Sequence, residues 1–316
     1  MKVTCFVKNW ALPLSMIAGV ISYFGCAALP LDTTAKTLCL DSIAVIQPSL
    51  IFLMLFITFC KVDISEMRLR GWHIVGILLQ AGLFCGLAVC SLRLDDTWRV
   101  ITEGAMVCLI CPTATAAAVV TRKLGGSAGG LSTYTLLINI TTALVVSSVV
   151  PLLHPAEGMS FWTNFTLINA KIMPLLFIPI VAALVVRRWW KRLPETLKEY
   201  PDLAFYLWCF ALTLAIAITV RSIVRSDYPV ICEAGIAAAS ALACVLQFAA
   251  GRWMGGRYDD ETRITAGQSL GQKNTVFAIW MGYTFFDPVT SIAGGFYSIW
   301  HNLFNSWQLY KQRTAL

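Results

Sequence analysis

Apolar runs of about 18–23 residues recur along the whole chain and are separated by short polar segments. Each run is close to the ~20 residues that a helix needs to cross a hydrocarbon core about 30 Å thick. The pattern predicts an all-α polytopic membrane protein with ten transmembrane helices. The predicted spans lie near 9–29, 44–61, 72–92, 100–121, 131–152, 168–187, 202–223, 229–250, 264–282 and 292–311.

Composition supports this fold class. The chain is 58% hydrophobic and 13% charged, whereas soluble domains average about 25% charged residues. The lipid bilayer is therefore the expected environment. The first run is too long for the apolar part of a signal peptide and is expected to be retained. The chain has eleven cysteines, mostly inside apolar runs, and only three histidines, so no metal site and no cofactor is expected.

Lysine and arginine gather at one side of the predicted topology, which places both termini in the cytoplasm by the positive-inside rule. Seventeen lie on that side: Lys2, Lys8, Lys61, Arg68, Arg70, Arg122, Lys123, Arg187, Arg188, Lys191, Arg192, Lys198, Arg252, Arg257, Arg263, Lys311 and Arg313. Five lie on the other side: Lys36, Arg93, Arg99, Arg221 and Arg225. Topology thus accounts for the net charge of +7, and neither a nucleic acid nor a protein partner is predicted.

The spans divide into two halves of five, 1–152 and 168–316, joined by a connecting loop at 153–167. An odd number of spans per half inverts the second half relative to the first, as is usual in secondary transporters. The fourth span of each half carries a helix-breaking residue, Pro112 in the first and Gly271 in the second, 159 positions later (271 − 112). Proline lacks an N–H and glycine is a weak helix former, so each can open its helix.

An opened membrane helix exposes backbone groups that are tolerated only where they line a cavity or bind something. The new helix N-termini are expected near Thr113 and Thr115 and near Asn274 and Thr275, where their partial positive charge suits an anion. A simple kink at each residue is the alternative. The second break also contains Lys273, and a lysine at the bilayer centre costs roughly 2.5–3.5 kcal/mol.

The chain resembles the bile acid:sodium symporter family at these segments. The family motifs C-P-G-G-T-A-S-N-V, E-V-G-M-Q-N-S and F-S-x-W-H-N correspond to Cys111-Pro-Thr-Ala-Thr-Ala-Ala-Ala-Val119, Ser269-Leu-Gly-Gln-Lys-Asn-Thr275 and Phe296-Tyr-Ser-Ile-Trp-His-Asn302. The resemblance implies a panel domain of spans 1, 2, 6 and 7 and a core domain of spans 3–5 and 8–10, with the broken helices crossing in the core. It also implies two sodium ions behind the crossing, an organic anion in front of it, and transport by alternating access.

The resemblance assigns the substrate-binding positions to Thr115, Asn274, His301 and Asn302. The sodium positions, by contrast, have changed. The family's glutamate corresponds to Ser269, its ligating glutamine to Lys273, and its Ser-Asn pair to Ala117 and Ala118. A methyl group cannot ligate a cation that prefers oxygen, so a sodium site is doubted. The coupling or sodium-replacing positions are then Gln80, Ala117, Ala118, Ser269, Gln272 and Lys273.

Three hypotheses account for Lys273. Its ammonium replaces bound sodium, because one lysine beside the neutral Ser269 has the same local charge of +1 as two sodium ions and one glutamate. Alternatively, Lys273 carries a coupling proton, or it pairs with Glu103 or Glu233 in a purely structural ion pair.

The favoured function is secondary transport of an organic anion, either bile-acid-like or a small carboxylate, across a bacterial inner membrane without sodium. A proton- or sodium-coupled symporter, or a non-transporting receptor or scaffold on the same fold, is the alternative. No enzyme is expected, because Glu103, Glu233 and His301 form no recognisable catalytic set. A channel is disfavoured because polarity is concentrated in two broken helices and the last span.

Overall fold

A computed structural model describes residues 10–30, 32–62, 64–190, 192–200 and 202–314. The described chain is entirely helical, apart from one isolated backbone bridge discussed below. Its α-helices are α2 (Ala11–Ala28), α3 (Thr33–Lys61), α4 (Gly71–Ser91), α5 (Asp96–Ile110), α6 (Ala117–Lys123), α7 (Ala128–Leu153), α8 (Phe161–Trp189), α9 (Arg192–Glu199), α10 (Leu203–Val224), α11 (Val230–Gly255), α12 (Asp260–Gly271), α13 (Thr275–Phe285) and α14 (Ile292–Thr314).

Six segments of the described chain are long and apolar enough to cross a membrane. They are Asp41–Lys61, Gly71–Ser91, Ala128–Leu153, Phe161–Trp189, Leu203–Val224 and Val230–Gly255. Two shorter apolar segments, Pro13–Ala28 and Thr275–Phe285, coincide with predicted spans. The protein is therefore a multi-pass helical membrane protein. The last predicted span corresponds to α14, whose 23 residues include several polar side chains.

Some boundaries differ from those predicted. Helix α3 begins at Thr33, whereas the span was predicted to begin near 44. The first turns of the helix contain polar residues, so the apolar run used for the prediction starts later than the helix. Helix α8 begins at Phe161, inside the predicted connecting loop 153–167, where Ser160 accepts a hydrogen bond from Thr163 as the N-cap. The short helix α9 was not predicted. Three basic residues used for the topology, Lys2, Lys8 and Lys191, lie outside the described residues.

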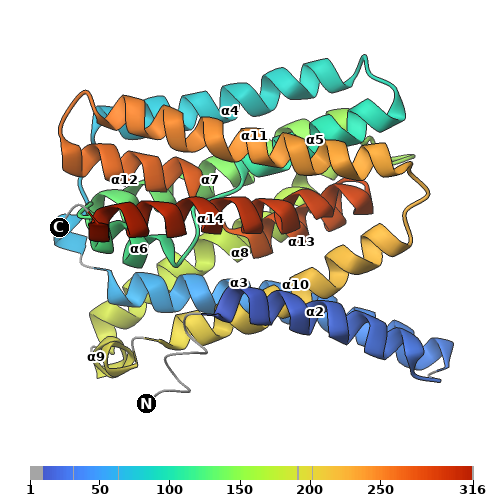
Figure 1. Ribbon diagram of the computed structural model, residues 1–316, viewed down its shortest axis with the longest axis horizontal. Coiled ribbons are helices and arrows are strands. Elements are labelled where there is room, and N and C mark those ends of the chain that lie inside the picture. The colour runs from blue at the N-terminus through green and yellow to red at the C-terminus, as the bar shows by residue number, and fades with distance from the viewer. Residues whose placement is uncertain (1–9, 31, 63, 191, 201, 315–316) are drawn as a thin grey trace.

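The helices run mostly along the long axis of the molecule (Figure 1). Helices α2, α3 and α10 pack together along one edge, and α4, α5 and α11 lie at the opposite edge. Helices α12, α13 and α14 lie between them, and α8 packs against both α3 and α7. The loops after α3, α6, α8 and α11 gather at the end where α14 finishes, and these loops together with the adjoining helix ends contain most of the basic residues.

Helices α11 and α12 approach each other closely at two glycines. A Cβ atom on Gly251 would lie 2.3 Å from the carbonyl oxygen of Ala266, and one on Gly255 would lie 2.3 Å from that of Thr262. Glycines four residues apart allow such backbone contact between membrane helices. This packing fixes α12, and the break that follows it, against α11.

Candidate functional site

The two interruptions in the helices meet in the interior of the protein. Helix α5 ends at Ile110 and α6 begins at Ala117, while α12 ends at Gly271 and α13 begins at Thr275. Thr113 and Lys273 form an antiparallel bridge between the two segments. The amide of Ala114 donates to the Gln272 carbonyl at 2.8 Å, and that of Asn274 donates to the Pro112 carbonyl at 2.8 Å. Residues 111–116 and 272–274 are called the crossing below.

Pro112 explains where the first helix ends. Having no N–H, proline cannot bond the carbonyl four residues before it, which belongs to Cys108. The side-chain amide of Gln247, on α11, donates to that carbonyl at 3.2 Å. The break is thus closed by a side chain from a distant helix. The new helix α6, however, starts at Ala117 with Ala116 as its N-cap, later than the N-terminus predicted near Thr113 and Thr115.

The last carbonyls of α5 also accept hydrogen bonds from side chains. The Leu109 carbonyl accepts from the Gln80 amide at 3.0 Å and from the Lys273 ammonium at 3.2 Å. The Ile110 carbonyl accepts from the Thr142 hydroxyl at 2.8 Å. A helix C-terminus leaves such carbonyls without intrahelical partners, and here α4, α7 and Lys273 of the crossing supply donors to them.

The end of α12 is closed in a similar way. The Ser269 carbonyl accepts from the Thr113 hydroxyl at 2.7 Å, and the Gly271 carbonyl accepts from the Tyr297 hydroxyl at 2.8 Å. The hydrogen bond from Thr113 to Ser269 has a counterpart in the one from Lys273 to Leu109. The two donors are 160 positions apart (273 − 113), and so are the two acceptors (269 − 109). The two hydrogen bonds are therefore offset by 160 residues, one more than the 159 that separate Pro112 from Gly271.

Gly271 has a different role from the one its sequence position indicated. It is the last residue of α12, and it is not among the glycines with positive φ, which in the described chain are Gly125 and Gly158. A Cβ atom there would lie 2.3 Å from the ring of Phe248. Glycine is needed because the ring of Phe248 packs directly on the backbone, and the helix opens one residue later, at Gln272.

Lys273 is a buried cation at the ends of two helices. Its side chain is 1% exposed, and no ion pair of Lys273 is found within the described part of the chain. The carboxyl ends of α5 and α12 carry partial negative charge from their aligned peptide dipoles. The ammonium therefore lies where a cation is favoured, with the Leu109 carbonyl as its hydrogen-bond acceptor.

A chain of buried polar side chains surrounds this ammonium. The Tyr134 hydroxyl donates to the Gln80 carboxamide oxygen, and the Gln80 nitrogen donates to the Gln247 oxygen at 2.6 Å. The Gln247 nitrogen donates to the Tyr297 hydroxyl at 3.1 Å. The resemblance indicated Gln80 but neither Gln247 nor the two tyrosines. A glutamine within an apolar run was the sequence signal that could have pointed to Gln247.

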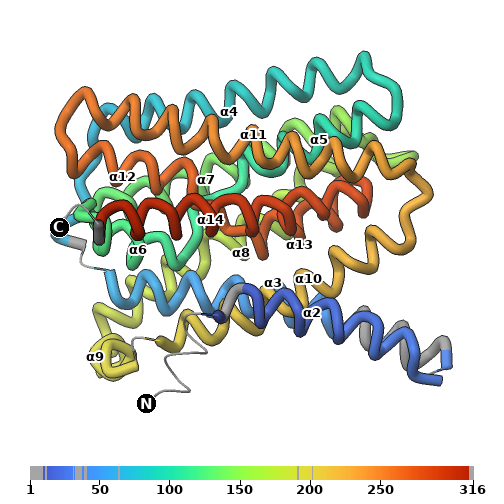
Figure 2. The backbone as a smooth tube through the Cα atoms, in the orientation of Figure 1, coloured from blue at the N-terminus to red at the C-terminus, as the bar shows by residue number. Residues whose placement is uncertain are grey.

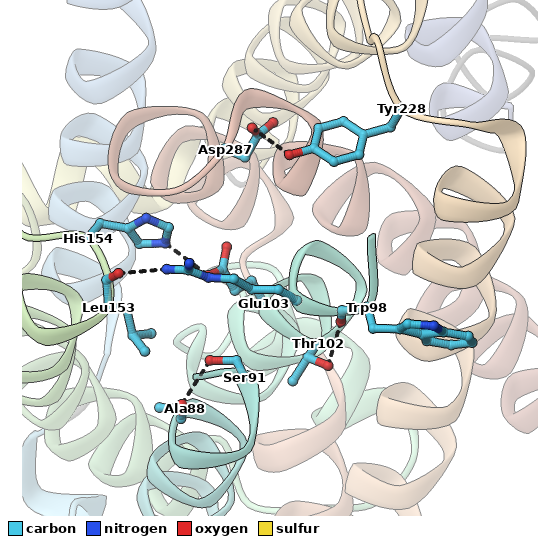
Figure 3. A network of polar contacts seen from close by, with 10 residues as sticks. Ala88, Ser91, Trp98, Thr102, Glu103, Leu153, His154, Tyr228 and Asp287 are labelled. Carbon is cyan, nitrogen blue, oxygen red and sulfur yellow. Dashed lines mark hydrogen bonds and ion pairs between the residues drawn. The ribbon is translucent and has the colours of Figure 1, made fainter. Parts of the chain in front are cut away.

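The acid proposed as an ion-pair partner lies in another cluster. Glu103 is 1% exposed and accepts from Arg99 at 3.2 Å and from His154 at 2.9 Å. Figure 3 shows the rings and carboxylates of this region, with His154 directed at Glu103 and with Tyr228 directed at Asp287. Pairing of Lys273 with Glu103 was thus a wrong alternative. Glu233 lies in the first turn of α11, half-buried.

The predicted substrate residues differ in burial and bonding. The side-chain oxygen of Asn274 accepts from the Phe277 amide at 3.2 Å and caps α13. His301 is 4% exposed, whereas Thr115 and Asn302 are half-buried. The Asn302 amide donates to the Ser298 carbonyl within its own helix at 2.7 Å.

The predicted coupling or sodium-replacing positions include two alanines and two residues with buried polar atoms. Ala117 and Ala118 are the first residues of α6. The Ser269 hydroxyl and the Gln272 carboxamide oxygen are buried and have no hydrogen-bond partner among the described residues. No group of three or more His, Cys, Asp or Glu side chains suited to a metal occurs in the described ranges.

Comparison of the sequence with models of known protein families and with curated proteins finds no match.

Proposed function

We propose that the protein is a secondary transporter that carries an organic anion across the membrane by alternating access and without sodium, with Lys273 in place of a bound sodium ion. The observation that carries the proposal is the burial of the Lys273 ammonium, which lies two residues after the end of α12 in the chain and donates to the carboxyl end of α5. Discontinuous helices that meet in the membrane interior are typical of substrate and ion sites in secondary transporters.

The pairing at the crossing supports two inverted five-helix repeats, 1–152 and 168–316, on a ten-helix plan. Antiparallel pairing of Thr113 with Lys273 relates the two segments by local two-fold symmetry. Helix packing also supports a panel domain of α2, α3, α8 and α10 beside a core domain built from the other long helices, as the resemblance to bile acid:sodium symporters implies. Movement of one domain against the other would expose the crossing alternately to each side.

The charge of Lys273 gives a physical reason for transport without a sodium gradient. A sodium ion must leave and return in each cycle, whereas the ammonium of Lys273 stays attached to the chain. Its positive charge offsets the partial negative charge at the carboxyl end of α5. The amino end of α13 is the candidate position for the acid group of the substrate.

The substrate is proposed to be an organic anion with a carboxylate or similar acid group. The Thr115 hydroxyl, the Asn274 and Asn302 side-chain amides and the His301 imidazole are the candidate ligands. The Asn274 nitrogen is a suitable donor because its oxygen caps α13. We place the protein in a bacterial inner membrane, with the basic end and both termini in the cytoplasm.

Uptake in proteoliposomes tests the proposal. Taurocholate and small carboxylates are supplied with and without a sodium gradient to the unmodified protein, to Lys273→Gln and to the control Lys171→Gln, which changes an exposed lysine of α8. We expect uptake that does not depend on sodium, at least a tenfold loss in Lys273→Gln and little loss in the control.

Other outcomes separate the alternatives. Strict dependence on sodium in the unmodified protein would overturn the replacement of sodium by Lys273. Uptake that follows an imposed pH gradient would favour a proton-coupled symporter. A ligand that binds to the protein but is not accumulated in vesicles would favour a receptor.

A further inference from the structure

Buried polar groups without partners are concentrated between α12 and α14. Of the twelve buried side-chain N or O atoms without a hydrogen-bond partner in the described chain, six belong to these two helices and a seventh to Gln272, the C-cap of α12 at the edge of the crossing. They are the Gln268 and Ser269 oxygens on α12, the Gln272 oxygen, and atoms of Ser298, His301, Asn305 and Gln308 on α14. These seven residues are called the α12–α14 seam. Both helices pack against α11, as their courses in Figure 2 allow, and Gln268 of α12 donates to Asn305 of α14 at 3.0 Å.

The four residues of α14 form one continuous stripe. They follow one another at intervals of three, four and three positions, which places them on one face of a helix. Ser298 is 0% exposed and Gln308 8% exposed. Ten residues of helix rise by about 15 Å, or half of a hydrocarbon core about 30 Å thick. The stripe therefore extends from the level of the crossing to the basic end.

The seam contains both hydrogen-bond donors and acceptors without partners, and this mixture indicates which kind of ligand it could bind. Gln268 and Gln272 present acceptor oxygens, Asn305 and Gln308 present donor nitrogens, and the two serines present hydroxyls that do both. A bound cation would satisfy only the acceptors, and an anion only the donors. Water satisfies both, and a buried water usually makes about three hydrogen bonds to such groups.

The two ends of the seam are different. At the basic end, Arg252 donates to Gln308 at 3.2 Å. Beyond the crossing, α14 continues into an apolar cluster that includes Ile292 and Ala293, both 0% exposed. Polar side chains therefore continue the seam toward the basic end, whereas apolar side chains follow the crossing on the other side.

We propose that the α12–α14 seam is a half-channel that binds a file of water molecules and hydrates the crossing at Lys273 from the basic end. It adds to the proposed transport function and does not depend on which solute is carried. The water file gives the buried ammonium and Gln272 access to the aqueous phase on one side.

Thiol labelling tests the half-channel. Asn305→Cys and Ser298→Cys proteins in vesicles are treated from the basic end with a charged, membrane-impermeant methanethiosulfonate and analysed by peptide mass spectrometry. Native Cys244, 2% exposed in the apolar cluster, and lipid-facing Cys85 are internal controls. We expect both new thiols to react at least tenfold faster than Cys244 and Cys85. Equal rates would overturn the proposal.

The three native histidines give a second test that needs no substitution. His154, whose side chain is 33% exposed, should react fastest with diethyl pyrocarbonate. His73 is buried and both of its ring nitrogens are bonded to the backbone, so it should be unreactive. His301 should react at an intermediate rate, because water reaches its unpartnered Nδ1. A His301 as unreactive as His73 would contradict the half-channel, whatever the outcome of transport measurements.

Discussion

The crossing and the α12–α14 seam differ in whether their buried polar groups have hydrogen-bond partners within the protein. At the crossing, side chains from α4, α7, α11 and α14 donate to the carbonyls released by the helix breaks. The seam adjoins the crossing at the end of α12. There, seven polar side chains have buried atoms without protein partners. An unsatisfied buried polar group costs about 1–3 kcal/mol. The comparison indicates that the crossing is held rigidly by the protein itself, whereas the seam depends on solvent.

Substitution of Gly271 should break the crossing with the largest effect on stability. In Gly271→Ala the new methyl group would lie 2.3 Å from the Phe248 ring. We expect a loss near the upper end of the ~1–3 kcal/mol typical of overpacking, measured as the free energy of unfolding in mixed micelles. Gly86→Ala is the matched control, because nothing lies within 4 Å of a Cβ atom at that position. An equal effect of the two substitutions would contradict the packing argument.

Substitution of Gln247 should have the next largest effect on stability. Comparing it with substitution of Gln268 tests the difference between the crossing and the seam. Gln247→Leu leaves the Cys108 carbonyl without its side-chain donor, and we expect a loss of about 1–3 kcal/mol. Gln268→Leu in the seam removes one hydrogen bond, to Asn305, together with an oxygen that has no protein partner. We expect it to cost under about 1 kcal/mol. If Gln268→Leu destabilised the protein as much as Gln247→Leu, the seam would be as rigid as the crossing.

Replacing Lys273 by an apolar residue should change stability little. Lys273→Met removes the cost of burying a charge, and the Leu109 carbonyl keeps its bond from Gln80 at 3.0 Å. We expect a change of less than about 1 kcal/mol in unfolding free energy, together with loss of transport. A large loss of stability would instead show that the ammonium is a structural element of the crossing.

The smallest predicted effect lies outside the membrane, at the start of α12. Hydrogen bonds from the Thr262 side chain and backbone lower the pKa of Asp259, the N-cap of that helix, from its ordinary value of 3.8. The charged carboxylate therefore contributes stability that is complete above the ordinary pKa and is lost as the pH falls through the lowered one. Asp259→Asn keeps the cap without the charge.

Thermal unfolding in detergent between about pH 2 and pH 6 measures this contribution. The melting temperature of the unmodified protein should exceed that of Asp259→Asn above the ordinary pKa, and the difference should vanish at the acid end. A difference that does not vary with pH would mean that the carboxylate charge has no role in the cap.

The sequence predicted much of the fold because apolar run length is a local property. A segment such as 203–224 is helical and apolar wherever it packs, and the helix α10 matches the predicted span 202–223. Polar first turns hid the true start of α3, and a loop of 15 residues was expected where α8 already begins at Phe161. Such boundaries depend on caps and neighbours, which hydropathy does not encode.

By itself, the sequence determined the apolar helices, the two helix-breaking segments and the presence of a lysine within one of them. These features follow from the properties of the residues in each segment, such as hydropathy and helix propensity. Only the tertiary structure decided which carbonyl accepts from Lys273, that Gly271 is required by Phe248, and that Glu103 belongs to a different cluster. Each of these depends on residues far apart in the chain. Contacts of that kind arise from the packing of helices, which no local pattern specifies.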